Sequence, residues 1–172
     1  DFYPLEGVNL KKISKILIDK QNIKENKIDV KKIIKKKETY YLRIKKLKFF
    51  PYVKQTIKLL KKRGIKSAIV TSGLKDRLYK SIPKKFLKEF DVIITGDDTK
   101  IGKPSKMPFV KAMERIGVKN KNCLVVENAP LGISSAKKAG VYCIALETTL
   151  NKKILKEADL ILPSFHEFYK FA

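Results

Sequence analysis

Short apolar runs without polar alternation recur through the second half of the chain. Continuous runs are typical of strands buried on both faces of a sheet. Segments with helical spacing separate them, and this repetition predicts an α/β fold with a parallel, doubly wound sheet. The predicted strands are SAIVTS (67–72), DVIIT (91–95), NCLVVE (122–127), YCIAL (142–146) and DLIL (159–162). The predicted helices between them cover 74–88, 107–116, 131–139 and 151–157.

The first third of the chain has helical periodicity only. Residues 10–21, LKKISKILIDKQ, form one amphipathic pattern, and Asp29 can cap a second, Lys-rich helix that runs to about residue 46. A further amphipathic helix is predicted over 51–64, before the first strand. We therefore expect a helical unit over 1–47 and an α/β core over 48–172.

The composition is that of a folded globular protein, with 44% hydrophobic and 33% charged residues. No apolar stretch approaches the roughly 20 residues that span a bilayer, and the start of the chain lacks a secretory pattern. Cys123 and Cys143 lie inside apolar runs, without the spacing of a metal site or a disulfide framework. We expect buried thiols, a cytoplasmic location and no membrane partner.

Basic residues are in large excess, with 40 Lys plus Arg against 17 Asp plus Glu and a formal net charge of +23. This charge favours encounters with anions of many kinds. Most of the basic residues are Lys spread along helical faces, as in 31–46, and no motif of a known nucleic-acid-binding module is present. We therefore predict a solvated basic surface and no specific nucleic-acid partner.

Polar residues stand where predicted strands end, and in a parallel sheet ligands gather at the carboxyl ends of the strands. Thr71, Ser72 and Gly73 end the first strand, and Lys103 lies in the loop GKPSKMPF. The Thr71 hydroxyl and the amides of Ser72 and Gly73 can donate hydrogen bonds to phosphoryl oxygens. Lys103 can supply a fixed positive charge.

Glu127 and Asn128 end the third predicted strand. A carboxylate directly after the apolar run CLVV is costly to bury unless it is paired, exposed or bound to a metal. The Glu127 carboxylate and the Asn128 side-chain carbonyl are hard oxygen ligands of the kind that Mg²⁺ prefers. The two residues therefore form a candidate metal site.

Three blocks of sequence together resemble the haloacid dehalogenase superfamily. These are FFPYVKQTIKLLKKRGIKSAIVTSG (49–73), VIITGDDTKIGKP (92–104) and VVENAPLGISSAKKAG (125–140), which follow the family's order and approximate spacing. The resemblance is strongest to the β-phosphoglucomutase and phosphoglycolate-phosphatase-like group. It implies a Rossmann-like core and a helical cap, of which 1–47 would be the later part.

The resemblance also implies roles for the strand-end residues. Thr71, helped by the amides of the two residues after it, would bind the transferring phosphoryl group, and Lys103 would neutralise charge on that group and on the nucleophile. Glu127 and Asn128 would hold Mg²⁺. Many relatives have Asp where Asn128 stands, and an amide carbonyl can still coordinate the metal with one negative charge fewer.

The family's first motif, a strand ending in Asp-x-Asp, is not found in the 172 residues. Asp97 and Asp98 match a different loop of the family. The resemblance places the motif-bearing strand between the strand that ends in Thr71 and the strand that ends in Glu127. We therefore expect the first core strand and the nucleophile to come from a preceding segment or a second chain.

With that segment supplied, the resemblance implies a Mg²⁺-dependent phosphatase of small phosphorylated metabolites that acts through an aspartyl-phosphate intermediate. Two alternatives stay open. The first is a phosphosugar mutase, which would return the phosphoryl group to a sugar held under the cap. The second is a catalytically inactive core that serves as a binding or regulatory module.

Overall fold

The computed structural model describes residues 13, 16, 18–20, 29–44 and 47–172, and every structural statement below concerns these residues. Their helices are α2 (Val30–Ile44), α3 (Val53–Lys62), α4 (Lys75–Ser81), α5 (Lys84–Leu87), α6 (Met107–Ile116), α7 (Pro130–Lys138) and α8 (Phe165–Phe171), with a 3-10 turn, η3, at Asn120–Asn122. Their strands are β1 (Ala68–Val70), β2 (Val92–Ile94), β3 (Leu124–Glu127), β4 (Tyr142–Leu146) and β5 (Leu160–Leu162).

Every strand pairing in this part of the chain is parallel, which confirms the predicted α/β class. The strands form two pieces, β1-β2 and β3-β4-β5, with Val70 opposite Ile94 in the first and Glu127 opposite Ala145 in the second. The division falls between β1 and β3, where the resemblance places the strand that bears the Asp-x-Asp motif.

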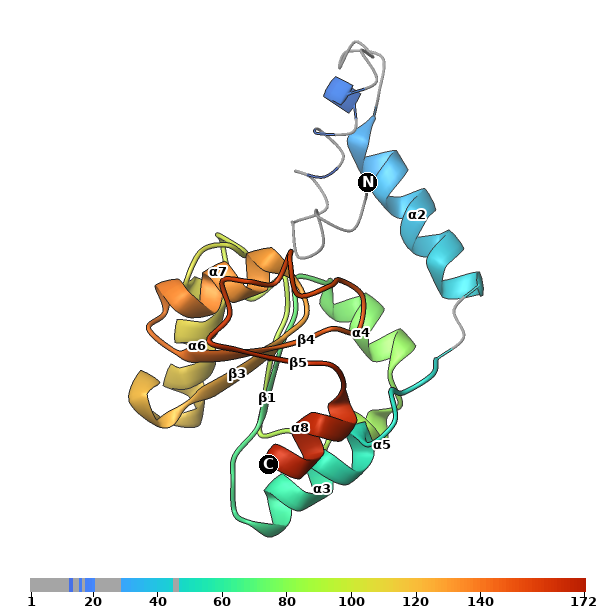
Figure 1. The fold of residues 1–172 in the computed structure, drawn as a ribbon. Coiled ribbons are helices and arrows are strands. Elements are labelled where there is room, and N and C mark those ends of the chain that lie inside the picture. Colours follow the sequence, from blue (N-terminus) through green and yellow to red (C-terminus); the bar gives the residue numbers. More distant parts are fainter. Residues whose placement is uncertain (1–12, 14–15, 17, 21–28, 45–46) are drawn as a thin grey trace.

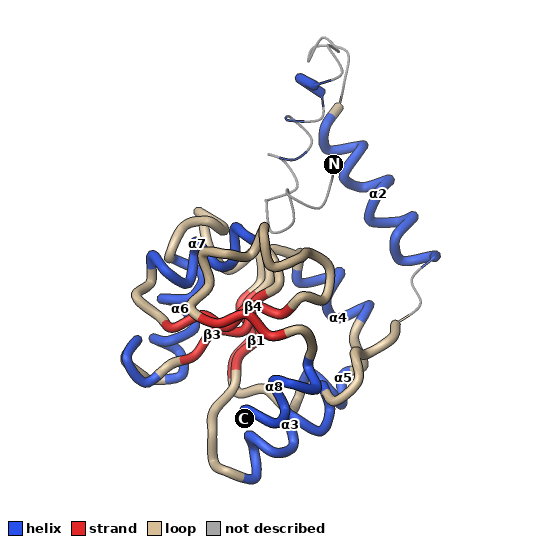
Figure 2. The backbone as a smooth tube through the Cα atoms, viewed as in Figure 1, coloured by secondary structure: helices blue, strands red, loops and turns tan. Residues whose placement is uncertain are grey.

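Helices cover the strands from both sides (Figure 1). α6 packs on β1 and β2, and α7 packs on β3 and β4. On the opposite face α8 packs on β5 and on α3 (Figure 2). α2 projects away from the strands and contacts the rest of the described chain at α4.

Successive side chains of β4 enter two different hydrophobic clusters, because neighbouring residues of a strand face opposite sides of the sheet. Cys143 and Ala145 belong to the cluster that contains Ile133 of α7, whereas Ile144 and Leu146 pack in a second cluster under α8. Both layers are dry, because these side chains are at most 2% exposed. The predicted burial of Cys143 is confirmed, and burial raises the pKa of its thiol to about 12. Cys123, which was also expected to be buried, is only partly buried and packs against the first cluster.

Most of the predicted elements form, with local differences. The Asp29 cap is confirmed, since its carboxylate accepts hydrogen bonds from the backbone N–H groups of Lys31 and Lys32 at 3.0 and 3.1 Å. The predicted helix over 74–88 is divided into α4 and α5 at Pro83, which cannot donate a helical hydrogen bond.

The predicted helix over 151–157 is wrong. The segment forms turns, in which Leu155 is fully buried while its neighbours on either side stay exposed. So short an element is costly to nucleate, and the burial of one leucine can be achieved without helix.

The predictions for the first part of the chain can be compared with the structure only where its residues are described. The amphipathic helix predicted over 10–21 lies largely outside the described residues. The junction at 45–46 also lies outside them, so the boundary near residue 47 stays a prediction. Among the described helices, none combines the length and hydropathy needed to cross a membrane.

Candidate active site

A buried ion pair joins the ends of the two sheet pieces. The Lys103 ammonium contacts the Glu127 carboxylate at the end of β3 and also donates to the Val70 carbonyl at the end of β1, with Nζ 3.2 Å from the oxygen. The two side chains are only 7% and 9% exposed. The ring of Phe109 lies 5.0 Å from Nζ. Removing two charges from water costs several kcal/mol, so this pair is a candidate for function.

Glu127 accepts a hydrogen bond from the loop before α7 and packs against the first turn of that helix. The backbone N–H of Asn128 donates to the second carboxylate oxygen at 3.2 Å. Gly132 provides the space for the carboxylate, because a Cβ atom at that position would lie well inside van der Waals contact with all three carboxylate atoms of Glu127. The glycine in the block PLGISS is therefore required by the side chain of Glu127.

The loop after β1 is shaped by internal hydrogen bonds. The N–H of Thr71 donates to Ile94, and the N–H of Gly96 donates to Gly73, both at 2.9 Å. The N–H of Gly73 donates to the Thr71 hydroxyl oxygen at 3.0 Å. The Gly73 amide, which was predicted to bind a phosphoryl oxygen, is thus used within the loop. It orients the Thr71 hydroxyl, and the hydroxyl proton of Thr71 can be donated to another acceptor.

Glu127 and Asn128 offer two oxygen donors of the kind that Mg²⁺ prefers, and the described residues do not complete a metal site around them. They include no group of three or more His, Cys, Asp and Glu side chains that could hold a metal. Glu127 brings one carboxylate, and the Asn128 side chain, whose nitrogen donates to Thr149 at 2.9 Å, brings one carbonyl oxygen. Mg²⁺ is commonly bound by one or two carboxylates together with waters and substrate phosphate oxygens. The chemistry of this donor set fits that arrangement.

Asp97 and Asp98 hold the loop after β2. Asp97 accepts from the backbone N–H of Lys75 at 2.7 Å, at the start of α4. Asp98 accepts from the N–H and the hydroxyl of Thr95 at 2.8 and 2.7 Å and pairs with Arg115 at 3.2 Å. The hydrogen bond from the Thr95 backbone is the main cause that lowers the pKa of Asp98. These contacts account for both aspartates without a role in catalysis.

One residue beside the Thr71 loop was not among the predicted site residues. The Arg77 guanidinium of α4 has Nη2 2.7 Å from the point where a Cβ on Gly73 would lie, and the Thr71 hydroxyl oxygen is 3.3 Å from the same point. Arg77 is one of four arginines among the 40 basic residues of the chain, and it lies outside the three blocks of sequence that carry the family resemblance.

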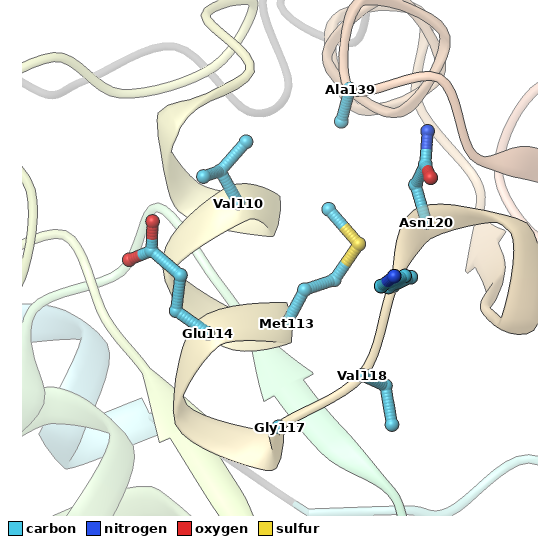
Figure 3. Close-up of a pocket in the computed structure, with 8 residues that line it drawn as sticks. Val110, Met113, Glu114, Gly117, Val118, Asn120 and Ala139 are labelled. Carbon is cyan, nitrogen blue, oxygen red and sulfur yellow. The ribbon is translucent and has the colours of Figure 1, made fainter.

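A surface groove lies away from these residues (Figure 3). It runs between α6 and η3, with the Met113 side chain projecting between Val110 and Asn120. Asn120 precedes β3, so the groove lies near the amino ends of the strands, whereas Lys103 and Glu127 meet at the carboxyl ends. Its lining is largely apolar and shares no residue with the ion pair.

The match to a family model agrees with this geometry. The model that describes haloacid dehalogenase-like hydrolases matches residues 1–146. The chain belongs to this family. The membership expected from the three blocks of sequence is thereby confirmed, and the match includes the helical first part of the chain.

Phosphatases are among the relatives of this haloacid dehalogenase-like chain. Validoxylamine A 7'-phosphate phosphatase of Streptomyces hygroscopicus subsp. limoneus is 35% identical over 109 residues, which are 63% of this chain and 51% of that protein. Hexitol phosphatase A of Escherichia coli (strain K12) is 33% identical over 108 residues, 63% of this chain and 50% of that protein. The chain thus matches about half the length of each of these relatives.

Solved structures of the haloacid dehalogenase-like fold are similar over more of the chain. A Bacteroides vulgatus protein, whose proposed activity is that of a β-phosphoglucomutase, superimposes with a TM-score of 0.82 at 29% identity. The superposition covers 98% of this chain and 70% of that one. The predicted subgroup of β-phosphoglucomutase-like and phosphatase proteins is confirmed.

Proposed function

We propose that the protein is a Mg²⁺-dependent phosphatase of small phosphorylated metabolites. The observation that carries the proposal is the buried Lys103–Glu127 pair, which brings a cation and a carboxylate to the strand end next to Thr71. The phosphatase relatives support the same reaction class.

Each residue has a role that its surroundings allow. The Thr71 hydroxyl donates to an oxygen of the phosphoryl group, with its direction set by the Gly73 amide. The Lys103 ammonium stabilises the negative charge that spreads over the phosphoryl oxygens as the bond to the leaving group breaks. Glu127 and the Asn128 carbonyl would hold Mg²⁺, which when bound offsets phosphoryl charge as a Lewis acid.

The nucleophile follows from the family resemblance. A carboxylate oxygen of the first Asp in the Asp-x-Asp motif attacks phosphorus, the bond to the leaving oxygen breaks, and the second Asp protonates that oxygen. Water then hydrolyses the aspartyl phosphate, releasing inorganic phosphate and regenerating the carboxylate. We propose that this motif is supplied by a preceding segment or a second chain, on a strand between β1 and β3.

A phosphosugar mutase is the second candidate, favoured by the similarity to the Bacteroides vulgatus structure. The two reactions share the aspartyl phosphate and differ in its acceptor, which is water in a phosphatase and a sugar hydroxyl in a mutase. Release of inorganic phosphate from a hexose phosphate therefore favours the phosphatase, and conversion to an isomeric phosphate without release favours the mutase.

The test uses the protein made from its natural coding sequence, assayed for phosphate release from an aryl phosphate and from hexitol phosphates with and without Mg²⁺. Thr71→Val removes the hydroxyl at nearly constant shape, and we expect it to lower kcat/KM by about 10- to 100-fold, the effect of one hydrogen bond to a charged group. Thr39→Val, at an exposed position on α2, is the matched control.

Three results would contradict the proposal. Absence of turnover in the natural protein would favour the inactive binding module. Turnover without Mg²⁺ would remove the metal from the mechanism. Equal activity of the Thr71→Val and Thr39→Val variants, both folded by thermal unfolding, would exclude the loop after β1 from the site.

A further inference from the structure

The Arg77 guanidinium lies beside the loop that follows β1. A Cβ atom on Gly73 would lie 2.7 Å from Nη2 and 3.4 Å from Cζ of Arg77, and 3.3 Å from the Thr71 hydroxyl oxygen. The guanidinium and the hydroxyl therefore share one side of the loop. A phosphoryl group that accepts a hydrogen bond from Thr71 would come within reach of the same guanidinium.

Residues of α2 hold Arg77 in this place. Its Nη1 lies 3.6 Å from Oε1 of Glu38, and its guanidinium lies 5.2 Å from the centre of the Tyr41 ring. Glu38 and Tyr41 are three residues apart on one helix and so face the same way. Nη1 is thus turned toward α2, which leaves the edge bearing Nη2 over the loop.

The residues around Arg77 carry a net charge, unlike the Lys103–Glu127 pair. Lys103 and Glu127 are each nearly buried and form a pair without net charge, although the ammonium can still donate a hydrogen bond to a phosphoryl oxygen. Glu38, in contrast, is shared between Arg77 and Lys37, whose Nζ lies 3.3 Å from the same carboxylate oxygen. Arg77, Glu38 and Lys37 together therefore carry one net positive charge. A net positive charge beside a hydroxyl donor favours the binding of a dianionic phosphate monoester.

The fork of N–H donors on a guanidinium suits both neighbours at once. One terminal nitrogen can keep its partner on α2 while the other binds a phosphoryl oxygen, a geometry for which arginine is better suited than lysine. The 3.6 Å separation from Glu38 is longer than a hydrogen bond, so the existing ion pair is not strong enough to prevent this.

We propose that Arg77 is a phosphoryl-binding residue of this site, held over the Thr71 loop by its contacts with α2. The inference rests on the proposed function, because it assigns a further ligand to the same phosphoryl group. The competing interpretation is that Arg77 only fastens α2 to α4. In that case its loss would lower stability without changing the affinity for phosphate.

Inorganic phosphate is the probe, titrated calorimetrically into the natural protein, so that binding is measured without turnover. Arg77→Gln is expected to weaken phosphate binding by about tenfold or more, the effect of one hydrogen bond to a charged group. Arg77→Lys keeps the charge but loses the fork, and an intermediate loss is expected. The KM for an aryl phosphate should rise in parallel.

The control is Arg43→Gln, which removes an exposed arginine from the opposite side of α2. It is expected to leave the phosphate Kd unchanged within about twofold, because long-range charge effects are screened. Thr71→Val marks the site itself. Thermal unfolding of each variant shows whether it is folded.

The outcomes separate the two proposals. Tight phosphate binding that is lost in Thr71→Val and unchanged in Arg77→Gln would overturn the role of Arg77 and leave the phosphatase site intact. Failure of the unmodified protein to bind phosphate would overturn the site and, with it, the role of Arg77. Equal losses in Arg77→Gln and Arg43→Gln would show a general charge effect and would also overturn the inference.

Discussion

The carbonyl oxygen of Ser72 lies 2.5 Å from the position that a Cβ atom on Gly96 would occupy. The loop after β1 and the loop after β2 are therefore in direct backbone contact. The hydrogen bond from the Gly96 N–H to the Gly73 carbonyl, at 2.9 Å, fixes the same contact. The position of the Thr71 hydroxyl depends on a residue more than 20 positions away in the sequence.

Gly96→Ala should displace the loop, because the added methyl group meets backbone rather than a flexible side chain. We expect a loss of about 1–3 kcal/mol in the free energy of unfolding, the usual cost of overpacking, and weaker phosphate binding. Chemical denaturation and calorimetry measure the two effects. Gly102→Ala, whose added methyl would meet nothing within 4 Å, should change neither. Equal behaviour of the two variants would contradict the prediction.

Gly132→Ala should displace the Glu127 carboxylate, because the added methyl group would occupy the space where this carboxylate packs against α7. Since Glu127 is also fixed by Lys103, the side chain cannot move without breaking the ion pair. The expected results are a lower thermal midpoint and a Mg²⁺ half-saturation concentration for turnover that rises about tenfold or more. Lys138→Ala, an exposed substitution on the same helix, is the control. An unchanged Mg²⁺ dependence would separate Gly132 from the metal site.

Lys103→Met should leave the Glu127 charge buried without its partner, at a cost of about 3–5 kcal/mol in the free energy of unfolding. The double variant Lys103→Met, Glu127→Met should recover most of this stability while staying inactive, because a well-packed apolar pair avoids the desolvation penalty. Denaturant titration of both variants checks this. Equal stability of the single and double variants would show that the pair is not buried as described.

The stability of the protein should depend on Asp98 in a defined pH range. Folding lowers the pKa of this carboxyl below its ordinary value of 3.8, chiefly through the hydrogen bond from the Thr95 backbone. Its stabilisation is therefore complete above that ordinary value and is lost as the pH falls through the lower folded-state pKa. Asp98→Asn should destabilise the protein at neutral pH, and the difference should shrink toward zero in strong acid.

Asp76→Asn is the control for the loss of a surface carboxylate. The Asp76 side chain is 71% exposed and pairs with Lys80 at 2.9 Å. At neutral pH the thermal midpoint should be lowered more by Asp98→Asn than by Asp76→Asn, because an exposed ion pair contributes little to stability, and the effect of Asp98→Asn should shrink as the pH falls. A constant difference at every pH would mean that the amide perturbs packing rather than charge.

Cys143 should resist alkylation in the native protein. Its side chain is fully buried, and burial raises the pKa of the thiol to about 12, so the reactive thiolate is scarce at ordinary pH. Mass spectrometry after iodoacetamide treatment should find this thiol unmodified in the folded protein and both cysteines modified after denaturation. Rapid native labelling of Cys143 would contradict the burial of β4.

The strand ends could be predicted because their signals are local. Continuous apolar runs identified the strands, and the polar residue after each run identified its carboxyl end. Since parallel strands present these ends on one side, the meeting of Lys103 with Glu127, across 24 residues, followed from the pattern.

Other features could not be predicted, because they depend on contacts that a local sequence pattern does not reveal. The block containing Gly132 was recognised, but its reason, the carboxylate above it, exists only in the fold. Arg77 is one of four arginines, and its place beside the Thr71 loop is visible only in the fold. The helix predicted over 151–157 failed because the burial of Leu155 depends on the core beneath it and not on its periodicity.

The division of the sheet also has a consequence for cooperativity. β3, β4 and α7 share the dry cluster around Cys143, whereas the β1-β2 pair has three-residue strands that are mostly half-buried. Regions with fewer buried contacts open at lower free energy. For these 172 residues alone, amide exchange should therefore be slowest in β4 and faster in β1. A strand supplied between β1 and β3 would pair with both and should slow exchange in β1, which would tie the phosphate-binding loop to the same cooperative unit as Glu127.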